Sequence, residues 1–281
     1  MEKLRIGSDE HKELFCRWFI DTHRDYDPSD WSWPGLDERA LARLRAVPIW
    51  GSALQAEIRA GALVARFSQT LSDPLIREAT ALQGLEEERH ARIFASMAEW
   101  YGLNTDAEPQ PVEDTARAFL DFAYKECLDA FLGFGAFRLA RDTNFLPDNF
   151  LSMFTGFMTE ETRHIVFFVN WIAYERIRRK RGAAVFQAGA TAVGYVRALR
   201  LLLTAVGSAN NDSGFMGDSD AFGGITLRRY LETCLHENEL QMAAFDPRLL
   251  RPRVLPAIAQ LILGLMSMGE RFGNFTRSRS A

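Results

Sequence analysis

EEERH (86–90) and EETRH (160–164) are the two stretches that decide the fold, and both follow one pattern, an acid followed by Glu-x-Arg-His. Each lies in the middle of a long segment with helical periodicity. On a helix, a glutamate and the histidine three positions later point the same way, so both can reach a single metal ion. Paired Glu-x-x-His motifs, with one glutamate from each of two other helices, form dinuclear carboxylate sites in four-helix bundles. The pattern therefore predicts such a bundle around two metal ions.

A dinuclear site of this kind requires one further glutamate upstream of each motif. Glu57 is the only acidic residue between Glu38 and Asp73, and its neighbours on a helix are small or apolar. Glu126 lies on a similar face, among phenylalanines and alanines. A lone carboxylate on an apolar face is costly to bury unless it is paired or bound to a metal. We therefore expect both glutamates to complete the site.

The predicted centre is rich in oxygen ligands. Four glutamates balance the charge of two divalent ions, and one imidazole per metal suits iron or manganese. The set contains none of the thiolates expected of structural zinc. We expect two iron (Fe) ions as the cofactor, with manganese or a mixed manganese–iron pair as the alternative. The predicted metal ligands, which are also the predicted catalytic residues, are Glu57, Glu87, His90, Glu126, Glu161 and His164.

Other charged residues of the two motifs are predicted to surround these ligands. Glu86 and Glu160 precede the ligand glutamates, and Arg89 and Arg163 precede the histidines. An acid in this position can accept the free imidazole N–H and set the tautomer of each histidine.

Helical periodicity covers almost the whole chain, and no long stretch alternates apolar and polar residues. The midpoints between Glu57 and Glu87 and between Glu126 and Glu161 fall in predicted turns, which brings the paired ligands to matching heights on two hairpins. The connector after residue 101 is long enough to run the length of the bundle and leave the second and third core helices parallel. The predicted helices are 9–22, 39–67 with a break near Pro48, 73–100, 115–141, 148–181, 183–206, and two more after a loop at 207–224.

The predicted organisation is one all-α domain over residues 1–281. A four-helix core covers 44–181, preceded by an N-terminal helix and an irregular segment at 1–43. Residues 182–281 are apolar enough to form helices that pack on the core.

The composition excludes several classes of function. Thirty-three basic and 37 acidic residues leave a formal net charge of −4, which argues against a nucleic-acid partner. Three widely separated cysteines provide no disulfide framework and fit a reducing compartment. The N-terminus has no signal-peptide pattern, and the longest apolar stretch, 254–268, is too short to span a bilayer. We expect a soluble, cytoplasmic protein.

The six ligand positions resemble those of the ferritin-like diiron-carboxylate superfamily. The two EExRH motifs are most similar to those of diiron acyl-carrier-protein desaturases and bacterial multicomponent monooxygenases. The resemblance covers about 44–181 and implies a ferritin-like four-helix bundle, two irons on the six residues and activation of O2 by the reduced pair. Arylamine N-oxygenases of this superfamily carry a further histidine at the position of Phe157, so their reaction is not expected here.

The expected function is that of an O2-dependent non-haem diiron oxidoreductase (oxygenase, desaturase or oxidase) acting on a small, partly apolar organic substrate. Its electrons would come from an external reductase or from the substrate, because the chain has no flavin, NAD or rubredoxin motif. An acidic carrier protein at the basic run 176–181 and a homodimer are left open as partners. The alternative functions are iron oxidation and storage, peroxide scavenging, or a metal-free scaffold.

Overall fold

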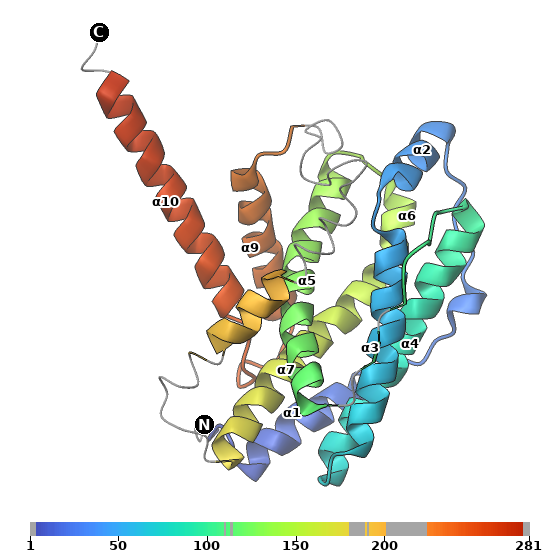
Figure 1. Ribbon diagram of the computed structural model, residues 1–281, viewed down its shortest axis with the longest axis vertical. Coiled ribbons are helices and arrows are strands. Elements are labelled where there is room, and N and C mark those ends of the chain that lie inside the picture. The colour runs from blue at the N-terminus through green and yellow to red at the C-terminus, as the bar shows by residue number, and fades with distance from the viewer. Residues whose placement is uncertain are drawn as a thin grey trace.

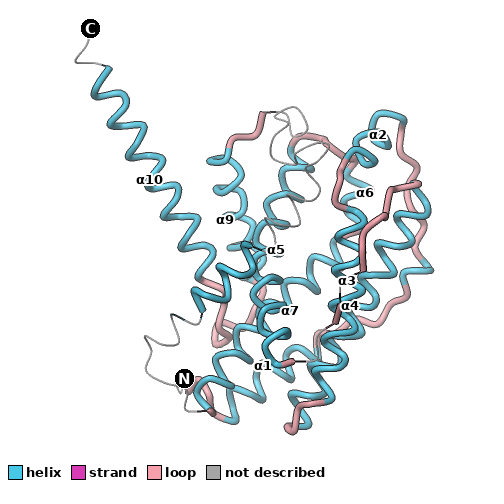
Figure 2. Tube along the Cα trace, viewed as in Figure 1, coloured by secondary structure: helices cyan, strands magenta, loops and turns pink. Residues whose placement is uncertain are grey.

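Helices make up the regular structure of this protein. In the computed structural model the described residues contain helices and loops but no strand (Figure 2), which confirms the all-α prediction. In the last helix, side chains are described up to residue 269. The described residues are 4–109, 111–112, 115–179, 189, 191–200 and 224–277.

Four long helices form the core of the bundle. They are α3 (Trp50–Gln69), α4 (Pro74–Tyr101), α5 (Ala116–Asp142) and α7 (Thr155–Arg178). α3 and α4 pack together as a hairpin, and α5 packs against both α7 and α3. The connector after α4 runs back along the bundle, so α4 and α5 point in the same direction (Figure 1). The predicted helical bundle and its parallel second and third helices are confirmed.

The turn between α3 and α4 is encoded by local chemistry. Asp73 is the N-cap of α4, and its carboxylate accepts hydrogen bonds from the N–H groups of Leu75 and Ile76. Pro74 occupies the first helical position, where its missing N–H costs nothing. Gly102 ends the helix in the left-handed region, with φ of 61°. The predicted helix 73–100 therefore matches α4 closely.

The predicted helix 148–181 is wrong as a single element. The structure divides it into α6 (Asp148–Met153) and α7, with a break at Phe154. The N–H of Phe154 bonds to the carbonyl of Leu151, which tightens the backbone at this point. The Phe154 ring is buried and contacts those of Trp33 and Phe94. Tertiary packing of one aromatic ring thus breaks a segment whose local pattern is continuously helical.

Helices before the core cover one side of it. α1 (Asp9–Asp21) packs across α4 and α7, and the short 3-10 helix η1 (Pro28–Asp30) lies against α4. α2 (Glu38–Ala46) precedes α3, and the break between them falls at Pro48 as predicted.

The C-terminal helices extend the bundle beside α5. α9 (Leu227–Ala243) packs against α5, and α10 (Val254–Arg277) packs against α9 and projects away from the rest of the molecule (Figure 1). Residues 191–200 are helical, within the predicted helix 183–206. The remainder of that prediction and nearly all of the predicted loop 207–224 lie outside the described residues. None of the described helices combines the length and apolar character needed to cross a membrane.

Candidate metal centre

A cluster of four buried side chains lies between α4 and α7. Glu87 and His90 come from α4, and Glu161 and His164 come from α7. All four are at most 7% exposed. One ligand atom from each lies within 4.8 Å of the others. The structure thus brings the two Glu-x-x-His motifs together in the interior.

Each carboxylate of the cluster reaches toward both imidazoles. His90 Nδ1 lies 3.0 Å from Glu161 Oε1 and 3.5 Å from Glu87 Oε2. His164 Nδ1 lies 3.1 Å from Glu87 Oε1 and 4.0 Å from Glu161 Oε2. The two oxygens of Glu87 therefore approach different histidines, and those of Glu161 do the same. This is the placement required of carboxylates that bridge two metal ions.

The atoms facing the middle of the cluster have no hydrogen-bond partner among the described residues. They are His90 Nδ1, His164 Nδ1, Glu87 Oε2 and Glu161 Oε1. Leaving four buried polar atoms unpartnered is costly. Metal cations would provide the missing partners, so the residues present fit a metal site.

The opposite nitrogen of each imidazole is held by an acid from the other motif. His90 Nε2 lies 2.9 Å from Glu160 Oε2, and Arg89 donates to the second oxygen of Glu160 at 2.6 Å. Because the Glu160 carboxylate also accepts from Arg89, it is the acceptor in this contact and Nε2 of His90 donates. Burial opposes protonation of His90, but Glu160 and Glu161 raise its pKa well above the ordinary value, so Nδ1 faces the cluster with a proton that a bound cation would replace.

The same arrangement surrounds His164. Its Nε2 lies 2.8 Å from Glu86 Oε2, while Arg163 donates to Glu86 Oε1 at 2.7 Å. Burial opposes ionisation of Glu86, but His164 and Arg163 hold its pKa at about 2. An acid thus accepts the outer N–H of each imidazole, as predicted, while the role of these residues around bound metal ions stays a prediction. The crossing of the acids between the two motifs was not part of the prediction.

The two lone glutamates also lie at this cluster. Glu57 Oε2 on α3 is 3.6 Å from His90 Nδ1. Glu126 on α5 is close enough to interact with Glu161, Glu87 and Glu57. Glu57 and Glu126 therefore lie beside the four-residue cluster but outside it, and they are less enclosed than its members.

Protons offset part of the negative charge of this site in the protein alone. Burial opposes protonation of His164, but Glu87 and Glu86 raise its pKa to about 10. Burial raises the pKa of Glu57 to about 8, against the opposing effect of His90. Burial and the negative charges of Glu161 and Glu87 raise the pKa of Glu126 well above its usual range. Carboxylates in such surroundings favour bound cations.

Two residues that were not predicted from the sequence contact the acids beside the histidines. His23 Nδ1 lies 2.5 Å from Glu86 Oε1, and the Tyr26 hydroxyl donates to Glu160 Oε2 at 3.2 Å. Both follow α1, so the N-terminal segment contacts the two acids that hold the imidazoles. They share no helical spacing with the motifs, and no sequence signal pointed to them.

The arginines of the motifs are also fixed by this N-terminal segment. The Arg163 guanidinium donates to the Phe19 carbonyl at 2.5 Å and lies 4.4 Å from the centre of the Phe19 ring. Arg89 lies 4.1 Å from the centre of the Tyr26 ring. Residues 19–26 thus cover the outer side of the cluster.

Aromatic side chains close the site from one end. The Phe157 ring lies 4.6 Å from the His90 ring and contacts Phe94 and Phe154. Phe157 therefore occupies space beside the imidazole, at the position where the sequence lacks a further histidine.

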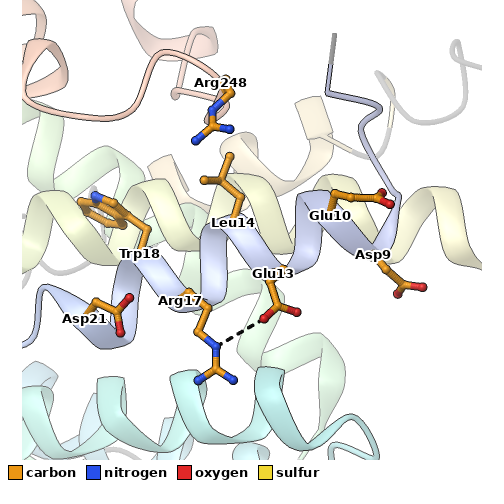
Figure 3. A pocket seen from close by; sticks show the side chains of 8 residues that line it. All are labelled: Asp9, Glu10, Glu13, Leu14, Arg17, Trp18, Asp21 and Arg248. Carbon is orange, nitrogen blue, oxygen red and sulfur yellow. Dashed lines mark hydrogen bonds and ion pairs between the residues drawn. The ribbon is translucent and has the colours of Figure 1, made fainter. Parts of the chain in front are cut away.

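A surface hollow of about 610 Å³ lies elsewhere, on the outer face of α1 (Figure 3). None of its lining residues belongs to the cluster, and Arg17 pairs with Glu13, one turn earlier on α1, at 3.4 Å. We assign it no role in the metal centre. It is lined by Asp9, Glu10, Glu13, Leu14, Arg17, Trp18, Asp21 and Arg248.

Comparison with models of protein families, with curated proteins and with solved structures finds no match. The interpretation of this centre therefore depends on its own geometry.

Proposed function

We propose that the protein is an O2-dependent non-haem diiron oxidoreductase with a ferritin-like bundle. The observation that carries this proposal is the pair of inward Nδ1 atoms. Both imidazoles are oriented by an acid at Nε2, and both present an unpartnered Nδ1 atom to the same two carboxylates. Two metal ions held between these atoms would account for this arrangement.

The six predicted ligands divide naturally between two ions. Glu57 and His90 lie together and would hold one ion, which leaves Glu126 and His164 for the other. Glu87 and Glu161 would span both. Four carboxylates and two divalent ions make a neutral centre, which lowers the cost of burying the charges. Iron and manganese suit this combination of oxygen and imidazole ligands.

A reduced iron pair, when bound, supplies the electron transfer that activates O2. Hydroxylation then balances as R–H + O2 + 2 electrons + 2 H⁺ giving R–OH + H2O, and desaturation yields a C=C bond and two H2O from the same inputs. An external reductase would provide the two electrons. The residues of this chain would orient the ligands, while the Phe157, Phe94 and Phe154 rings pack together and make one end of the site apolar. This aromatic end supports a small, partly apolar substrate.

Metal content is the decisive first test. After anaerobic loading with Fe(II), mass spectrometry should find about two irons per chain. Glu161→Gln should reduce this number because it removes a charged ligand at the middle of the cluster. Glu88→Gln is the matched control, since Glu88 is exposed on α4 beside the ligand Glu87 and should leave both irons bound.

The loaded protein should then consume O2 when a chemical reductant and a small apolar substrate are supplied. The ligand variant should lose this activity, and the control should keep it. A folded chain that binds no iron would overturn the proposal in favour of a scaffold. Uptake of many irons per chain would indicate iron storage instead.

A further inference from the structure

α10 has an unusual composition for a helix that projects from the molecule. Residues 254–269 contain no charged side chain, and the helix extends away from the bundle (Figure 1). One side of α10 is accounted for by packing within the chain. Leu255 and Ala259 are buried in the main apolar core, and Leu263 packs against it. A helix that is apolar on all sides is normally buried on all sides.

The other side of α10 exposes large apolar residues. Their spacing alternates between three and four, which places them at the a and d positions of a heptad repeat. Phe272 and Phe275 continue the same spacing along the sequence. We name these four residues the α10 seam: Ile258, Leu261, Leu265 and Met268, which are 44%, 64%, 55% and 50% exposed.

Two glycines beside the seam provide an independent observation. Gly264 and Gly269 occupy the g and e positions of the same heptads, on either side of the seam. A Cβ atom added to either glycine would meet no described atom within 4 Å. A glycine inside a helix costs about 1 kcal/mol relative to alanine, and no contact within the described chain explains this cost. Small residues beside a seam let a second helix approach closely.

We propose that the α10 seam binds the α10 seam of a second copy of this chain, forming a symmetric dimer. An uncharged surface does not select a charged partner, so it disfavours nucleic acid or an acidic carrier protein. A heptad stripe of this kind is complementary to itself, and symmetric pairs of identical chains are the commonest oligomers.

The exposed area is sufficient for a dimer of moderate affinity. Together with Ile262, the seam exposes on the order of 500 Å² per chain, near the upper end of the largest apolar patches on monomers. Pairing two seams buries about 1,000 Å² in total, close to the lower bound for a biological interface. Dimerisation should therefore depend on concentration in the micromolar range.

Sedimentation of the full-length protein tests this directly. The parent chain should approach twice its mass of 31.8 kDa as its concentration rises from about 1 to 100 µM, a range that brackets moderate interfaces. Leu261→Glu combined with Leu265→Glu should raise the dissociation constant at least 100-fold. Leu240→Glu is the control, because Leu240 on α9 is also 51% exposed but lies outside the seam.

A charge-swap experiment identifies the partner as a second copy. The double glutamate variant and the matching double lysine variant (Leu261→Lys with Leu265→Lys) should each be monomeric alone but form a mixed dimer when combined. Both should keep the helical circular dichroism and metal content of the parent, because the seam is exposed and distant in sequence from the ligands.

Three results would overturn the proposal. One is a parent chain that stays monomeric at 100 µM, whether or not it floats with phosphatidylcholine vesicles. Another is a dimer that the seam substitutions do not weaken. The third is a failure of the two charge variants to associate. Since metal content is measured separately, none of these results affects the proposed diiron function.

Discussion

Replacing Glu86 by glutamine tests the outer layer of the centre most sharply. The Glu86 side chain is fully buried and accepts from His164 Nε2 at 2.8 Å and from Arg163 at 2.7 Å, with His23 at 2.5 Å. Glu86→Gln preserves the shape but leaves a single accepting oxygen. If the new amide nitrogen faces Arg163, this buried cation loses its carboxylate partner and keeps only neutral acceptors at Phe19 and Thr22. If the amide nitrogen faces His164 instead, it favours the tautomer that places a proton on Nδ1.

Either orientation has a measurable cost. Removing one partner of a buried charged pair destabilises a protein by about 3–5 kcal/mol, and we expect the lower end because one hydrogen bond survives. Loss of an outer contact to a metal-binding histidine reduces metal affinity by about 10–100-fold. Urea unfolding of the chelator-treated protein measures the first effect, and anaerobic Fe(II) titration measures the second.

The control is again Glu88→Gln, which changes an exposed neighbour with the same chemistry. It should remain within about 0.5 kcal/mol of the parent and bind iron equally well. If Glu86→Gln behaved like this control in both assays, the assigned orientation of His164 by Glu86 would be refuted.

Three further predictions concern the surrounding structure. At Asp73, burial opposes ionisation, but Lys12 and the N–H groups that it caps hold its pKa below the usual range. The stabilisation of the fold by ionised Asp73 is therefore complete above the ordinary pKa of 3.8 and is lost as the pH falls through the lower folded pKa. Asp73→Ala should lower the free energy of unfolding by about 1–2 kcal/mol in urea at pH 7, and by less in acid. Asn170→Ala should cost about 2–4 kcal/mol in the same assay, because buried Asn170 forms hydrogen bonds with His11 and with both backbone groups of Leu250. A change below 0.5 kcal/mol would show that these hydrogen bonds do not stabilise the fold. Tyr26→Phe should cost about 1 kcal/mol and leave two irons bound, since Arg89 still holds Glu160; loss of iron on mass spectrometry would show that the hydroxyl is essential.

Much of the fold was predictable because its signals are local. The Asp73–Pro74 pair specifies where α4 begins through capping chemistry that involves neighbouring residues only. The break at Phe154 was not predictable, because it depends on rings from distant parts of the chain. The exposed side of α10 was not predictable either, since apolar spacing alone does not show which side of a helix meets the core.

The sequence by itself determined the two Glu-x-x-His pairs of the buried cluster, since helical spacing places Glu87 beside His90 and Glu161 beside His164. Only the tertiary structure decided how the outer layer is connected. Glu86 accepts a hydrogen bond from the histidine of the other motif. His23 and Tyr26, from the segment after α1, contact the acids of the two motifs. The reason is physical. Contacts within a helix follow from its fixed rise and turn, whereas contacts between helices depend on how the whole chain packs.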